Sequence, residues 1–237
     1  MNKFMFMGKP MSLRRFFTYV IGLFFMSLGI AFAVNSDFGV SPVTTLPYVV
    51  SRILGISVGT GTWVAYGCYI IIEALICRKN FKMIYILQFP AAVMFGYFTD
   101  FSKWLIAPLG MPQSWVFQLL YVLIGVVIVG LGLMAYLEAD IMAIPPDALA
   151  VVIANLVKKP LGNVKRIFDF SMVGISLILS LVFLHSYQGL WIGTIIAAFG
   201  VGRMLKFWSK LFREKLKAFL WGKQPEQLEQ TVEASLN

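Results

Sequence analysis

The sequence predicts an all-α, polytopic membrane protein with six transmembrane helices, built as two inverted three-span repeats that each carry a short half-helix after the first span. Three observations predict this fold class. Hydrophobic residues make up 59% of the 237 residues and charged residues only 13%, which is too apolar for a soluble domain of this size. Apolar segments of membrane-spanning length recur along the chain. The two halves also resemble each other in register.

Six apolar segments are long enough, or nearly so, to cross a hydrocarbon core of about 30 Å at about 1.5 Å per residue. They cover residues 16–34, 63–76, 84–105, 116–137, 167–184 and 190–207. Two further apolar segments, 42–54 and 145–157, would form helices only about 20 Å long. We therefore expect these two segments to be half-helices that do not span the bilayer alone.

Both half-helices have beginnings that the sequence defines. Ser41 is a suitable N-cap for the first, with Pro42 as its first helical residue. Pro145 and Pro146 start the second, and Asp147 falls in its first turn, where a negative charge is favourable.

The two halves match without gaps at an offset of 103 residues over most of this region. The identical pairs in this register are Ile21/Ile124, Gly22/Gly125, Leu28/Leu131, Gly29/Gly132, Asp37/Asp140, Pro42/Pro145, Leu46/Leu149, Val49/Val152 and Gly59/Gly162. With one extra residue the third spans also match, through Phe95/Phe199, Gly96/Gly200 and Trp104/Trp208. Because the shared Asp, Pro and Gly residues determine backbone geometry, the match predicts an internal duplication.

Basic residues predict the orientation, because Lys and Arg near span ends stay on the cytoplasmic side. A cytoplasmic N-terminus places nearly all of them inside: Lys3, Lys9, Arg14, Arg15, Arg78, Lys79, Lys82, Lys158, Lys159, Lys165, Arg166 and the cluster between 203 and 223. Only Arg52 and Lys103 then lie outside. Three spans per unit invert the second copy and return the C-terminus to the cytoplasm.

This count divides the chain into three parts. Residues 1–110 form the first repeat, with spans one to three, and residues 111–210 form the inverted second repeat, with spans four to six. Residues 211–237 form a cytoplasmic extension, which is basic and amphipathic at first and ends in a polar tail from residue 224.

The segments that lead into the half-helices are the predicted solute-binding site. Arg52, Lys158 and Lys159 stand at the half-helix C-termini and prefer a membrane surface, so each loop would dip inward and the two N-termini would face each other near the bilayer centre. Their unpaired N–H groups suit a carboxylate, a phosphate or a polar neutral group. The candidate binding residues are Asp37, Gly39, Ser41, Thr44, Thr45, Asp140 and Asp147. The alternative is that both segments lie along the interface as amphipathic caps.

Four acidic residues are candidates for proton or ion coupling: Asp37, Asp140, Glu73 and Asp169. Asp37 and Asp140 could equally cap their own loops by accepting backbone N–H bonds. Asp169 follows Arg166 by three residues, so we expect an ion pair between them. For Gly22, Gly29 and their counterparts, spaced seven apart, we expect close helix packing.

Nothing in the sequence predicts an enzyme, a cofactor or a metal site. There is one histidine, His185, and the two cysteines, Cys68 and Cys77, lack a metal-ligand spacing. No phosphate loop or dinucleotide fingerprint is present. The net charge of +9 is explained by loops beside anionic lipid, so the expected partner is the lipid bilayer and not nucleic acid.

The motif Asp-Phe-Gly-Val-Ser-Pro at 37–42, the Thr-Thr-Leu-Pro that follows it, the opening span and the overall length carry a family resemblance. The chain resembles the YczE-like, YitT-related integral membrane proteins of bacteria. The resemblance implies a multi-pass protein of the bacterial cytoplasmic membrane.

Two functions of different classes follow from this organisation. The first is a transporter or channel for a small polar or anionic solute, in which the repeats rock against each other. It predicts a cavity between the repeats lined by Asp37, Thr44, Thr45, Asp140 and Asp147. The alternative is an integral membrane regulator or assembly partner, acting as a homo-oligomer or with another membrane protein, which predicts a closed interior and an exposed groove of small residues.

Overall fold

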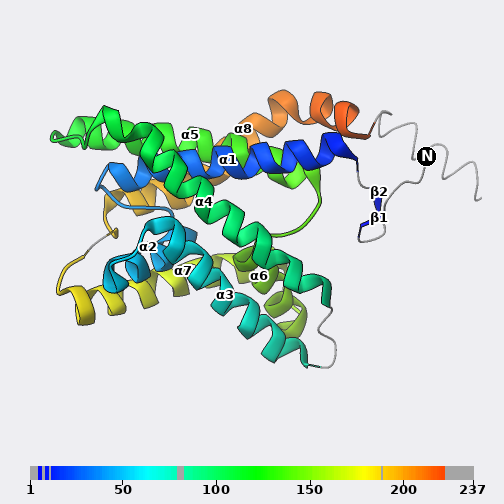
Figure 1. The fold of residues 1–237 in the computed structure, drawn as a ribbon, viewed down its shortest axis with the longest axis horizontal. Helices are drawn as coiled ribbons and strands as arrows, with labels where there is room; N and C mark the ends of the chain where they lie inside the picture. The colour runs from blue at the N-terminus through cyan, green and yellow to red at the C-terminus, as the bar shows by residue number, and fades with distance from the viewer. Residues whose placement is uncertain (1–4, 7–8, 11, 79–82, 188, 222–237) are drawn as a thin grey trace, which may run out of the picture.

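The computed structural model describes residues 5–6, 9–10, 12–78, 83–187 and 189–221, and this part of the chain is almost entirely helical (Figure 1). Its helices are α1 (Leu13–Asn35), α2 (Pro42–Leu54), α3 (Val58–Cys77), α4 (Gln88–Ile106), α5 (Trp115–Ala139), α6 (Pro145–Val157), α7 (Leu161–Leu179) and α8 (Ile192–Trp221). Short turns η2 (Met83–Leu87) and η3 (Ala107–Leu109) flank α4, and a π-helical turn η4 (Ser180–Leu184) extends α7. Two-residue strands β1 (Met5–Phe6) and β2 (Lys9–Pro10) pair before α1. The predicted all-α class is confirmed.

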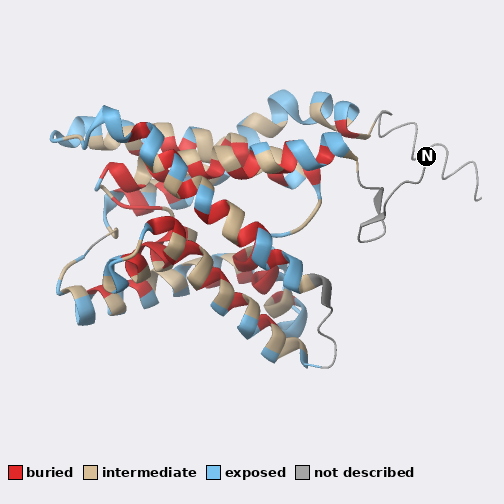
Figure 2. Ribbon diagram, in the orientation of Figure 1, coloured by how far each residue is buried: buried red, intermediate tan, exposed pale blue. Residues whose placement is uncertain are grey.

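Within the described part of the chain, four helices are long and apolar enough to cross a membrane, judged by length and composition. They are α1, α3, α5 and α7 with its extension to Leu184. Their outward faces carry large apolar side chains such as Leu75, Phe117 and Ile178, and in Figure 2 the exposed residues lie on the outside of the bundle. These four helices indicate a membrane protein.

The helices lie in two layers joined by α4 (Figure 1). In the first layer α1 packs along α5, and α5 packs along α8. In the second layer α2 and α6 each pack against α3 and α7. The diagonal helix α4 contacts both α1 and α3 and so connects the layers.

Glycines bring α1 and α5 into backbone contact. A Cβ on Gly22 would lie 2.6 Å from the Tyr136 nitrogen, and a Cβ on Gly29 would lie 2.6 Å from the Gly125 oxygen. The predicted packing role of these glycines is confirmed, since larger residues would push the helices apart. Because Gly22 faces Tyr136 while Gly29 faces Gly125, the two helices run antiparallel.

The short helices α2 and α6 have the predicted limits of 42–54 and 145–157. Ser41, in an extended conformation, precedes Pro42, and α2 ends at Gly55 in the left-handed region with a φ of 64°. Lys158 ends α6 in the same region, with a φ of 53°. Local signals therefore determine where each short helix begins and ends.

The helices of the two halves begin at nearly constant offsets, and α5 begins 102 residues after α1. Helices α6 and α7 begin 103 residues after α2 and α3, and α8 begins 104 residues after α4. Most packing partners correspond as well, since α1 packs on α4 as α5 packs on α8. The largest difference is that α3 packs along α4, whereas α7 and α8 form no comparable contact.

Helix α8 is longer than predicted, and several residues named in the sequence analysis lie outside the described residues. Helix α8 continues without a break through Trp221, so the expected boundary at residue 210 falls inside a helix. The polar tail from residue 224, together with Lys3, Lys79, Lys82 and Lys223, lies outside the described residues.

Candidate functional site

A cavity of about 350 Å³ lies between the two helix layers, where the N-termini of α2 and α6 come together. Ser41, Pro42 and Thr44 line it from the start of α2, and Ile144 and Asp147 line it from the start of α6. Its apolar wall comes from α1, α4, α5 and α8, through Met26, Ile30, Phe95, Val129, Leu133 and Ala197. We call this space the central cavity.

Three charged side chains form a cluster in the wall of the central cavity. Lys165 Nζ on α7 lies 2.8 Å from Asp147 Oδ1 on α6 and 3.2 Å from Asp169 Oδ1 one turn further along α7. About a quarter of each side chain remains exposed, between 26% and 27%. The Lys165 ammonium nitrogen and Asp169 Oδ1 are themselves buried, so the cluster holds two carboxylates around one ammonium group within the cavity wall.

Arg166 also lines the cavity, but it does not pair with Asp169 as the sequence spacing suggested. Its guanidinium donates to Asn163 Oδ1 at 2.8 Å and to the Gly162 oxygen at 3.2 Å. Lys165 takes the expected place of Arg166 because its spacing of four residues puts it on the same helix face as Asp169. The ion pair of Asp169 therefore has Lys165 as its basic partner, and the predicted partner Arg166 was wrong.

Another part of the cavity wall is polar without being charged. The Ser41 and Thr44 hydroxyls are hydrogen-bonded to each other at the start of α2. Tyr66 reaches the cavity from α3 and is otherwise buried. Thr45 lies just outside: its hydroxyl donates to the Pro42 oxygen at 2.8 Å and accepts a bond from Ser176 of α7 at 3.0 Å.

Many residues of the cavity wall come in pairs from the two halves of the chain. At an offset of 103 the pairs are Met26/Val129, Ile30/Leu133, Ser41/Ile144, Thr44/Asp147 and Tyr66/Asp169, and at an offset of 104 the pair is Phe95/Phe199. The charges all stand in the second half, because Thr62, Thr44 and Tyr66 occupy the positions that correspond to Lys165, Asp147 and Asp169.

The cavity reaches the molecular surface on one side. Phe170 of α7 and Phe199 of α8 line it and are both strongly exposed. The opening therefore lies between α7 and α8, the two helices that do not pack along each other.

A family model described as "Family of unknown function (DUF6198)" matches residues 13–210, which include every residue of the central cavity. The chain belongs to this family. The DUF6198 chain is also 28% identical over 170 residues to the "Uncharacterized protein YyaS" of Bacillus subtilis (strain 168). That alignment covers 71% of this chain and 81% of the relative. No solved structure matches.

The DUF6198 structure separates Asp37 and Gly39 from the central cavity. Both line another surface hollow, with Gln118 of α5 and the segment around Tyr187. Asp37 is exposed in a left-handed conformation, with a φ of 51°. Gly39 has a φ of 113°, and a Cβ there would lie 2.8 Å from the Thr194 nitrogen, so this glycine lets the loop approach α8.

Asp140 lies at the C-terminal end of α5 and lines a third pocket, beside α8. It is exposed, and its backbone is in the left-handed region with a φ of 46°. Its counterpart Asp37 shares both features. These two predicted binding residues therefore lie in different pockets, and neither lines the central cavity. Their shared feature is the left-handed backbone, which Asp adopts more readily than most residues.

Glu73 and Asp100 have local partners away from the cavity. Glu73 is only 1% exposed and accepts a bond from Gln88 Nε2 at 3.2 Å. Asp100 of α4 accepts bonds from the Ser57 hydroxyl at 2.5 Å and from the Gly59 nitrogen at 2.8 Å. Asp100 thus caps the N-terminus of α3 and ties α3 to α4.

Of the residues predicted to bind solute, Ser41, Thr44 and Asp147 meet in the central cavity, whereas Asp37, Gly39, Thr45 and Asp140 do not line it. Of the predicted coupling residues, Asp169 alone lines it. Lys165 was missed because it was counted as a flanking charge of a span. Its i, i+4 spacing to Asp169 was the available signal.

Proposed function

We propose that this DUF6198 protein is a membrane transporter for a small polar or anionic solute, and that the solute binds in the central cavity. The observation that carries the proposal is the meeting of two short-helix N-termini at one cavity that also holds ionised side chains. Helix N-termini offer unpaired N–H groups and a partial positive charge, which suit anionic or polar groups. Ionised groups inside an apolar bundle are costly and occur mostly where they serve function.

The size and lining of the cavity favour a small organic solute. A volume of about 350 Å³ is near the lower end of small-molecule sites. Met26, Ile30 and Phe95 can contact an apolar body, while Lys165 and Arg166 can bind an acidic group. The carboxylates of Asp147 and Asp169 hold Lys165 in position and would release it to a competing anion.

We further propose six spans in two inverted repeats, with α4 and α8 as the third and sixth spans. Nearly constant offsets of helix starts and of cavity residues support the duplication. The antiparallel packing of α1 and α5, the first spans of the two copies, supports the inversion. Arg14 at the start of α1 donates to the Phe219 oxygen near the end of α8 at 3.2 Å, which supports both ends lying on one side of the membrane.

The basic residues near these ends support a cytoplasmic location for both. We also propose a relation between this family and the YczE-like, YitT-related proteins of the bacterial cytoplasmic membrane, on the basis of the motif at 37–42.

The difference between the two helix pairs supports alternating access. Gly59 of α3 and Gly96 of α4 are in backbone contact, and Asp100 strengthens that contact. Their counterparts Gly162 and Gly200 do not meet, and Met204 stands at the position that corresponds to Asp100. The two helices α3 and α4 of the first repeat are thus closed onto each other, whereas α7 and α8 of the second repeat are apart. Exchange of these two arrangements would move the cavity opening across the membrane.

Ligand-dependent stabilisation tests the binding site. Purified protein in neutral detergent is unfolded by heat in the presence of pools of carboxylates, phosphates and polar neutral metabolites. We expect at least one pool to raise the unfolding midpoint of the wild type.

The same pool should stabilise Asp147→Asn and Lys165→Met much less, whereas Asp37→Asn, outside the cavity, should respond like the wild type. An equal response of all three variants would contradict the site. Failure of every pool to stabilise the wild type would favour the regulator or assembly-partner alternative.

A further inference from the structure

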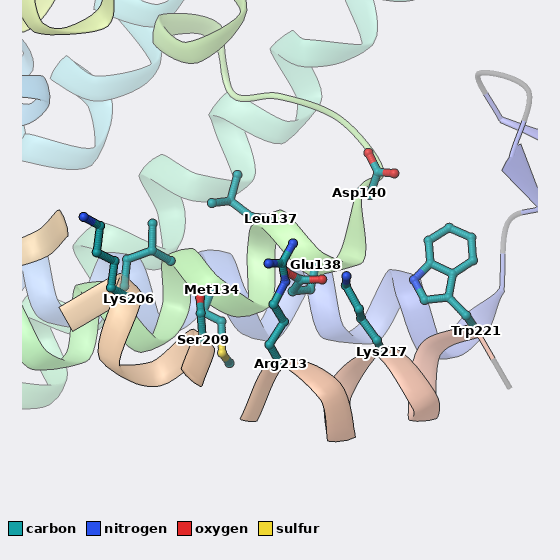
Figure 3. A pocket seen from close by; sticks show the side chains of 10 residues that line it. Met134, Leu137, Glu138, Asp140, Lys206, Ser209, Arg213, Lys217 and Trp221 are labelled. Atoms are coloured by element: carbon teal, nitrogen blue, oxygen red, sulfur yellow. The ribbon is translucent and has the colours of Figure 1, made fainter. Parts of the chain in front are cut away.

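The pocket beside α8 that Asp140 lines is independent of the proposed transport site and lies between the C-terminal end of α5 and the C-terminal half of α8 (Figure 3). Its volume is about 710 Å³. One face of α8 supplies Lys206, Ser209, Arg213, Lys217 and Trp221, spaced three or four residues apart. The end of α5 supplies Glu138 and Asp140. We call this space the basic groove.

Each acidic side chain in the basic groove has a cation beside it. Arg213 Nε donates to Glu138 Oε1 at 2.7 Å. Arg15 interacts electrostatically with Asp140, donates to the Asp140 main-chain oxygen and donates to the Ala139 oxygen at 2.9 Å. Trp221 packs over the Arg15 guanidinium, 4.4 Å from its centre to the ring centroid.

The remaining cations give the groove its net positive charge. Among the described residues, no acidic side chain forms an ion pair with Lys206 or Lys217. Figure 3 shows Lys217 beside Arg213 and Lys206 further along α8, beyond Ser209, so the two lysines lie at different places along the groove. The groove therefore offers two ammonium groups and the Ser209 hydroxyl to an anionic ligand.

The position of the groove identifies the kind of anion. Helix α5 is 25 residues long and apolar enough to cross a membrane, so its end at Ala139 is where it leaves the hydrocarbon core. Exposed Phe207 and Phe219 lie on the same part of α8, and Trp221 closes the groove. A ligand with an anionic head and apolar chains matches this combination of charge and exposed apolar surface.

We propose that the basic groove binds the phosphate headgroup of an acidic phospholipid. Lys217 and Lys206 attract the anionic headgroup from different places along the groove, and the acyl chains lie along the exposed apolar side chains of α8. Bound there, the lipid joins the ends of α5 and α8, two helices whose basic and acidic side chains already meet at Arg213 and Glu138.

The test uses the full chain in neutral detergent micelles with increasing mole fractions of phosphatidylglycerol or phosphatidylcholine, and it measures the thermal unfolding midpoint. Phosphatidylglycerol should raise the midpoint, and phosphatidylcholine should not. Lys206→Gln/Lys217→Gln should lower the apparent affinity for phosphatidylglycerol roughly 30-fold, since each lysine near an anionic headgroup contributes to the binding free energy and the two contributions multiply in the affinity. Lys206→Arg/Lys217→Arg should retain most of it.

The matched control is Lys210→Gln/Lys215→Gln, which removes the same charge from exposed positions of α8 outside the groove. It should stay within about threefold of the wild type, because neither side chain lines the groove. An equal loss of affinity in both glutamine double variants would overturn the proposal, since the positive charge of α8 as a whole would then explain the binding. Equal stabilisation by the two lipids, or by inorganic phosphate at the same concentration as by phosphatidylglycerol, would overturn it as well.

Discussion

Lys165 Nζ on α7 lies 2.8 Å from Asp147 Oδ1, in the first turn of the short helix α6. This ion pair connects an apolar helix long enough to span a membrane to a helix that is too short to do so. It stands in the wall of the central cavity, with Asp169 on its other side. The pair therefore has both a structural role, in holding α6 against α7, and a position suited to contact with a solute.

Removal of the central cation should destabilise the protein. Lys165→Met leaves Asp147 and Asp169 as two carboxylates without their shared partner. We expect a loss of about 1–3 kcal/mol in the free energy of unfolding, less than for a fully buried pair because the cluster is partly exposed. Unfolding by sodium dodecyl sulfate in mixed micelles measures the loss.

The double variant Lys165→Met/Asp147→Asn should recover part of that stability, since it removes one of the unpaired charges. Lys159→Met, at an exposed position before α7, should behave like the wild type. A double variant less stable than Lys165→Met would contradict the account of the cluster.

The glycine contact between α1 and α5 should be sensitive to one added methyl group. A Cβ on Gly29 would lie 2.6 Å from the Gly125 oxygen, so Gly29→Ala should cost about 1–3 kcal/mol through forced separation of the helices. The same detergent titration measures the cost. Gly174→Ala in α7 is the control, because no heavy atom lies within 4 Å of its Cβ position. A similar cost for both variants would show that helix contact at Gly29 is not the cause.

The sequence predicted the features set by local signals better than those set by packing between distant segments. The limits of α2 and α6 follow from Pro42, Pro145 and the residues after each helix, so they could be predicted. The same holds for the glycines of α1 and α5, which recur at a helical spacing.

The positions of the candidate site residues depend on contacts far along the chain, and for that reason several predictions failed. Asp37 and Asp140 share a left-handed backbone, but α7, α8 and their loop decide what surrounds each of them. Lys165 looked like a flanking charge until the packing of α6 on α7 brought Asp147 beside it. No local pattern specified that contact.

The capping of α3 by Asp100 should contribute to the closed arrangement of α3 and α4. Asp100→Ala removes acceptors for the Ser57 hydroxyl and the Gly59 nitrogen, and we expect a cost of about 1 kcal/mol in the free energy of unfolding. Glu214→Ala, at an exposed position of α8, serves as the control and should cost little. Hydrogen exchange of the first turn of α3 is a second measurement. Unchanged exchange there in Asp100→Ala would contradict the capping role.

Alternating access predicts that α7 can close onto α8 as α3 closes onto α4. With Cys68 and Cys77 replaced by Ser, the pair Gly162→Cys/Gly200→Cys should form a disulfide under an oxidation catalyst, because the closed arrangement brings the two positions to about 6 Å. Gly174→Cys/Gly200→Cys is the control, since residue 174 lies about 18 Å further along α7. Gel mobility measures both yields. A yield for the first pair no higher than that of the control would contradict closure.

The most direct test of the proposed function is uptake by reconstituted protein. Proteoliposomes containing the wild type, Asp147→Asn or Asp37→Asn are incubated with a bacterial metabolite extract, and mass spectrometry quantifies what their lumen accumulates relative to empty liposomes. Transport through the central cavity predicts that at least one small polar or anionic metabolite accumulates with the wild type and Asp37→Asn, and at least tenfold less with Asp147→Asn. Accumulation that matches empty liposomes, or that is equal for Asp147→Asn and the wild type, would contradict it.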